Sequence, residues 1–95
     1  MSPDEILQRA AFALSTRRPQ EAERLAREVL KTSGRHVGAL HVLGYALVAQ
    51  GRFDDAIALL EPIVRGRHDA EFETQLAIAL HGAGRVSPAM RSMIS

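Results

Sequence analysis

The sequence repeats itself at an interval of 33 residues, and this internal period limits the possible folds more than any other feature. The segment 40–47 shifted back by 33 positions meets residues of similar size at 7–14. Shifting the middle of the chain forward by 33 places Gly51-Arg52 on Gly84-Arg85 and Ala56 on Ala89. A period of this length is typical of arrays in which each unit is one small supersecondary element. The chain is therefore expected to be a stack of similar units.

Each unit has the apolar spacing of paired helices. Apolar residues recur at intervals of three and four, as at Leu40, Leu43 and Leu47, which is the helical period. Gly51, Gly84 and Pro19 mark the breaks between the helices of a pair. Aromatic residues are only 4% of the chain, so the core must consist mainly of Ala, Leu, Val and Ile. The predicted helices cover residues 3–15, 19–32, 36–49, 53–66, 70–82 and 87–95.

The middle unit carries the most specific pattern. It places large residues at Leu40 and Leu47, a Leu43-Gly44 pair between them, an aromatic residue at Phe53 and a small residue at Ala56. This pattern resembles the tetratricopeptide repeat. The resemblance implies an all-α array of helix-turn-helix repeats, an α-solenoid of about six helices with the last one short. Residues 1–95 would form a single domain with repeats at about 3–35, 36–69 and 70–95, the last one truncated.

Two residues have specific structural consequences. Gly44 and Ala56 carry almost no side chain, which predicts a close helix crossing, and Gly44→Leu should overpack it by about 1–3 kcal/mol. Pro62 lies inside the fourth predicted helix and predicts a bend there.

Tetratricopeptide-like proteins bind extended or helical peptides in a groove lined by the first helix of each repeat. The resemblance assigns groove positions to Gln8, Arg9, Phe12, His41, Val42, Tyr45, Thr74, Gln75, Ile78 and His81, with Glu5 and Gly38 beside them. Phe12, Tyr45 and Ile78 recur at the 33-residue interval and would be apolar anchors, flanked by Arg9, His41 and His81. The alternative is that Phe12 and Tyr45 complete the core between repeats.

The resemblance therefore implies a protein-interaction module with a protein or peptide partner. Some family members grip a terminal carboxylate of a chaperone with Lys and Asn, but Gln8, Arg9, His41 and Thr74 or Gln75 stand at those positions. A chaperone C-terminus is therefore not the expected partner.

The C-terminal end suggests self-association. Residues 87–95 provide barely two helical turns, so the capping helix usual in such arrays is missing. Met90, Met93 and Ile94, with the outer side of Leu76 and Leu80, would form an apolar strip that favours a homodimer. Alternatively, the chain is a fragment of a longer protein, such as an accessory domain of an enzyme, or a homo-oligomeric scaffold whose groove holds a neighbouring copy.

Composition and spacing argue against other classes. The net charge is +1, so the chain lacks the basic excess of a nucleic-acid-binding protein. Residues 76–94 also fit a helix-turn-helix layout, but its second helix has only Arg91 as a base-reading cation. No cysteine, secretory signal or run of about 18 apolar residues is present, which favours a cytoplasmic location without membrane insertion. The four histidines lack metal-binding spacing, and no catalytic motif occurs, so no metal, cofactor or enzymatic activity is expected.

Overall fold

The computed structural model describes residues 2–66 and 69–84. Within these ranges the chain folds into helices without any strand, which confirms the predicted all-α repeat array. The helices are α1 (Pro3–Ser15), α2 (Pro19–Thr32), α3 (Val37–Ala49), α4 (Phe53–Gly66) and α5 (Ala70–Gly82). The sixth predicted helix, at 87–95, lies outside the described residues.

Local capping residues determine where the helices begin. Pro3 and Pro19 occupy the first turns of α1 and α2, where a missing N–H costs nothing. The predicted start of α3 at residue 36 is one residue early because His36 is the N-cap, and its Nδ1 accepts a hydrogen bond from the Ala39 N–H at 3.3 Å. Asp69 caps α5 in the same way, accepting from the amides of Glu71 and Phe72.

The turn after the first helix of each unit has the same backbone conformation three times. Arg17, Gly51 and Gly84 have φ angles of 61°, 75° and 76°, and they stand at equivalent positions of the 33- to 34-residue period. A left-handed φ is free of steric cost for glycine but costs about 1–2 kcal/mol for a residue with a side chain. The repeated turn therefore explains the two glycines, and Arg17 adopts the same geometry at a cost.

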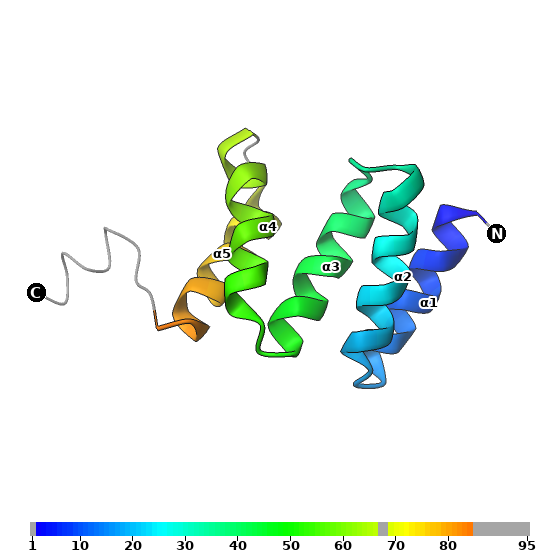
Figure 1. Cartoon of the computed structure of the whole chain (residues 1–95), viewed down its shortest axis with the longest axis horizontal. Coiled ribbons are helices and arrows are strands. Elements are labelled where there is room, and N and C mark those ends of the chain that lie inside the picture. The colour runs from blue at the N-terminus through cyan, green and yellow to red at the C-terminus, as the bar shows by residue number, and fades with distance from the viewer. Residues whose placement is uncertain (1, 67–68, 85–95) are drawn as a thin grey trace, which may run out of the picture.

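The helices form a row in which α1, α3 and α5 are successive neighbours (Figure 1). α1 contacts α3 and α3 contacts α5, whereas α2 and α4 do not contact each other within the described residues. We call α1, α3 and α5 the first-helix row. α4 remains helical through Pro62 as far as Gly66, so the proline does not end the helix.

Small side chains fill the contacts between the helices. Ala10, Ala13, Ala22, Leu25 and Ala46 form a buried cluster that joins α1, α2 and α3. A second cluster has members from α2, α3, α4 and α5. It contains Ala26, Leu43, Leu47, Ala56, Ile57, Leu60, Phe72 and Ala79. Alanine at a helix contact lets the backbones approach closely, so this composition produces a thin, closely packed array.

Gly44 makes room for a side chain of α5. A Cβ atom added at Gly44 would lie 2.1 Å from Gln75 Oε1 and 3.5 Å from a methyl group of Leu60. Gln75 is only 1% exposed and its Nε2 donates to the His41 carbonyl at 3.2 Å, so moving its amide away from a new side chain would disturb this buried contact. The absence of a side chain at Gly44 is therefore needed for the packing of α5 on α3, more than for the contact with Ala56 that the sequence suggested.

We expect Gly44→Ala to lower the free energy of unfolding by about 1–3 kcal/mol, because the new methyl group overlaps the Gln75 amide. In a Gln75→Ala background the same change should cost at least about 1 kcal/mol less, since the clash is gone. Urea unfolding of the four proteins measures this coupling. Additive effects of the two substitutions would contradict the assigned contact.

Glu23 connects α2 to the turn between α3 and α4. Its carboxylate accepts from Gln50 Nε2 at 2.8 Å, from Arg52 Nη1 at 2.7 Å and from Arg27 Nε at 2.9 Å. The side chain is only 13% exposed, so Glu23 is a largely buried link between α2 and this turn, and its partners take the place of water. The Gln50 amide, helped by Arg27 and Arg52, outweighs the desolvation and lowers the pKa of Glu23.

Glu23→Gln should lower the free energy of unfolding at pH 7 by about 1–2 kcal/mol, because the charged acceptor is lost. The folded-state pKa of Glu23 lies below its ordinary value of 4.5, so the carboxylate stabilises the fold fully above that pH. The difference between wild type and variant should then shrink as the pH falls through the folded-state pKa. Thermal melts between pH 3 and 7 measure it, with Glu28→Gln on the exposed side of α2 as the control. A difference that does not depend on pH would contradict this role.

Candidate functional site

Three exposed apolar side chains mark the first-helix row. Phe12 on α1, Tyr45 on α3 and Ile78 on α5 are 69%, 46% and 47% exposed. They are the large apolar side chains that the described part of the chain leaves exposed, and they stand at the 33-residue interval. We call these three residues the apolar ladder. Because α1 contacts α3 and α3 contacts α5, the ladder runs across the three helices of the first-helix row.

A depression adjoins the first member of the ladder. It has a volume of about 410 Å³ and is lined by Glu5, Gln8, Arg9 and Phe12, one face of α1. These are the four residues that the sequence assigned to the groove in the first unit. The lining combines one acidic, one basic and one amide side chain with the Phe12 ring, so it offers both apolar contact and hydrogen bonding to a peptide.

The predicted groove residues of the second and third units divide into two groups. Thr74 and His81 are exposed, as Gln8 and Arg9 are in the first unit, and Val42 is half-buried. Gln75 is buried, and its side chain packs against Gly44 and the His41 backbone. The assignment of Gln75 to an open groove therefore does not agree with this structure, in which the amide holds α5 on α3.

His41 also turns toward α5. Its ring stacks on Phe72 with centroids 3.9 Å apart and planes 5° apart, and its Nε2 lies 3.3 Å from a Glu71 carboxylate oxygen. Its Nδ1 lies 3.4 Å from Gln75 Nε2. These contacts leave only the edge of the ring for a ligand, since 16% of the side chain is exposed.

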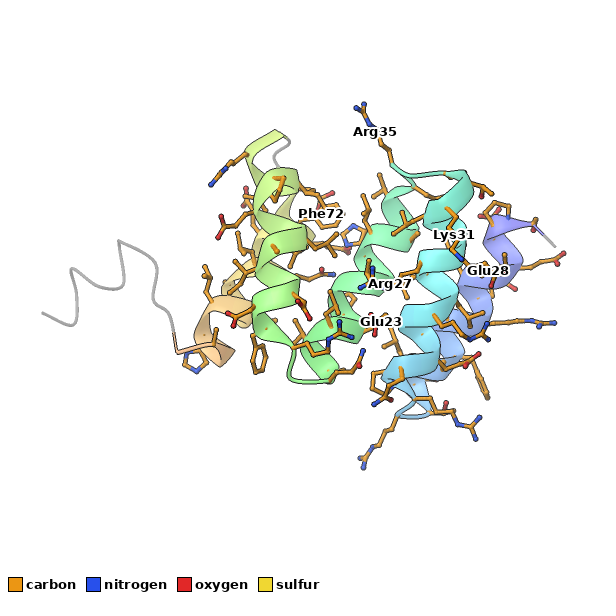
Figure 2. The ribbon with its side chains drawn as sticks, viewed as in Figure 1. Glu23, Arg27, Glu28, Lys31, Arg35 and Phe72 are labelled. Atoms are coloured by element: carbon orange, nitrogen blue, oxygen red, sulfur yellow. The ribbon has the colours of Figure 1, made fainter. Side chains whose placement is uncertain are left out.

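Phe72 is the residue that the sequence reasoning missed. It is fully buried, and Figure 2 shows it between α3 and α4, although it belongs to α5. At the 33-residue interval it corresponds to Ala39, a small residue that is also buried. The sequence signal that could have revealed Phe72 is the replacement of a small residue by an aromatic one at this position of the third unit.

Three further sequence predictions concern self-association, metal binding and membrane insertion. Met90, Met93 and Ile94, predicted to mediate a homodimer, lie outside the described residues, so that interface stays a prediction. In residues 2–66 and 69–84, no group of three metal-ligating side chains comes together. No helix in the same ranges has both the length and the apolar character needed to cross a bilayer.

The row of similar helix pairs defines a helical-repeat protein, and comparison with known families gives its class. The family model described as the tetratricopeptide repeat matches residues 13–77, so this chain belongs to the tetratricopeptide repeat family. Repeats of this family generally mediate protein–protein interaction and are not catalytic modules. No curated protein and no solved structure matches the chain.

The exposure of the ladder predicts that it contributes little to stability. Phe12→Ala and Tyr45→Ala should each lower the free energy of unfolding by less than about 1 kcal/mol, as expected for exposed positions. Leu60→Ala, at a fully buried position, should cost about 2–5 kcal/mol in the same urea titration. A comparable loss from Phe12→Ala would mean that the ring completes the core between the repeats.

Proposed function

We propose that this protein is an interaction module that binds a peptide segment of a partner protein along the apolar ladder. The observation that carries the proposal is the exposure of Phe12, Tyr45 and Ile78 on three neighbouring helices, because exposed large apolar side chains in a row are typical of a protein-binding surface. The membership in the tetratricopeptide repeat family supports the same class of function.

The spacing of the ladder limits the shape of the bound segment. Axes of packed helices lie about 8–10 Å apart, so neighbouring ladder residues are separated by about one such interval. A segment in polyproline II conformation has three residues per turn and advances by about 3.1 Å per residue, so three residues span the same interval and return to the same face. The surface therefore fits a polyproline II segment with apolar residues at positions i, i+3 and i+6. In a helical peptide, with a rise of about 1.5 Å per residue, the matching positions are i, i+7 and i+14.

The polar residues around the ladder would fix the direction of the peptide. Arg9 and Glu5 lie at the α1 end, and Thr74 and His81 are exposed on α5. Hydrogen bonds from these groups to the peptide backbone add orientation, while most of the affinity comes from burying the apolar anchors.

The triple variant Phe12→Ala/Tyr45→Ala/Ile78→Ala should lose the partner in affinity capture from a native extract, with at least a tenfold reduction in recovery, because all three anchors are removed. The matched control is Arg24→Ala/Arg65→Ala, which truncates two exposed side chains on α2 and α4. Light scattering of each protein reports its oligomeric state.

Loss of the partner from the triple variant alone, with the oligomeric state unchanged, supports the ladder as the binding surface. Equal recovery by all three proteins would overturn the proposal. Loss of an oligomer in place of a heterologous partner would show that the ladder binds a second copy of the chain.

A further inference from the structure

The two helices of the middle unit contact each other less extensively than each contacts its outer neighbour, α2 or α5. α3 contacts α2 far more extensively than it contacts α4, although α3 and α4 are consecutive. Figure 2 shows Phe72 between α3 and α4, and its ring stacks on His41 of α3. This stack therefore links α5 to the N-terminal half of α3.

Two depressions lie on these helices, one between α3 and α4 and one on α2. One has a volume of about 380 Å³ and is lined by Arg35, Leu40, Pro62, Ile63 and Gly66, so it lies between the start of α3 and the end of α4. The other has a volume of about 300 Å³ and is lined by Arg27, Leu30 and Lys31 of α2. Leu30, Leu40 and Ile63 all pack against the larger core cluster, so both depressions have apolar floors supported by that core.

The charged residues of these depressions all have the same sign. Arg27, Lys31 and Arg35 line them, and no carboxylate does. Arg27 is paired with Glu23, but neither Lys31 nor Arg35 takes part in an ion pair with a residue that the structure describes. The depression beside the ladder differs, because Glu5 and Arg9 balance each other there. A ligand in these two depressions therefore meets an apolar floor, with the positive charges of Lys31 and Arg35 at its edge.

We propose that these two depressions form a second docking surface, which binds an acidic peptide segment of another protein through apolar contacts with Leu40 and Ile63 and carboxylates near Lys31 and Arg35. Charge complementarity favours this occupant, since a basic segment would add like charge at the same edge. The surface is separate from the apolar ladder, so the module would hold two partners or two segments of one partner at once.

A pair of synthetic peptides tests the proposal. Both are acetylated and amidated ten-residue chains with Leu at every third position, and the remaining positions are Glu in one and Lys in the other. The Glu peptide, added to ¹⁵N-labelled protein, should shift the amide signals of Leu40, Ile63 and Gly66, and the shifts should weaken in 0.5 M salt because the contacts are ionic. The Lys peptide should leave these signals unchanged.

The variant Lys31→Glu/Arg35→Glu should weaken binding of the Glu peptide about tenfold. The control Arg17→Glu/Arg18→Glu changes the net charge by the same amount in the exposed turn between α1 and α2, and it should change the affinity less than twofold.

Several results would overturn the proposal. These are shifts confined to Phe12, Tyr45 and Ile78, equal weakening by both double variants, or no shift at millimolar peptide. Self-association of the chain that Lys31→Glu/Arg35→Glu abolishes would also overturn it, by assigning the surface to a second copy. A failure here leaves the ladder proposal standing, because the ladder variant removes none of these residues.

Discussion

The close approach of helices at small side chains is the constraint on which the rest of this structure depends. Ala13, Ala46 and Ala79 are buried on α1, α3 and α5, and each stands 33 residues from the next. With side chains this small, neighbouring helices pack at short distance and need few large residues between them. The larger apolar residues Phe12, Tyr45 and Ile78, each directly before one of these alanines, are not needed in the core and face outward. The exposure of the apolar ladder therefore follows from the small residues of the core.

The same packing explains why polar groups are found inside the third unit. Gly44 leaves a space on α3 that the Gln75 amide fills, and the amide nitrogen donates to the His41 carbonyl. Gln75 Oε1 has no hydrogen-bond partner among the described residues, which is an unfavourable arrangement for a buried acceptor. The stack of His41 on Phe72 adds apolar contact beside it. The joint between α3 and α5 thus combines a tight fit with an incompletely satisfied polar group.

Much of the fold was predictable because its signals are local. Prolines at the starts of α1 and α2 and left-handed glycines at 51 and 84 depend only on the backbone geometry of one turn. The repeat interval then predicted that Phe12, Tyr45 and Ile78 share a position, and the structure exposes all three. The interval failed where the units differ. Phe72 replaces the small Ala39, and Gln75, equivalent to the half-buried Val42, is drawn into the core, so contacts between units could not be inferred from similarity between them.

The most direct test of this account uses the absence of cysteine from the chain. Paired cysteines at positions 12 and 45, 45 and 78, or 12 and 78 would be treated with a thiol-reactive cross-linker about 10 Å long, the distance between neighbouring helix axes. We expect efficient cross-linking of the first two pairs and little of the third, because the ladder residues lie on successive members of the first-helix row. Equal cross-linking of 12 with 78, or none between neighbours, would contradict it.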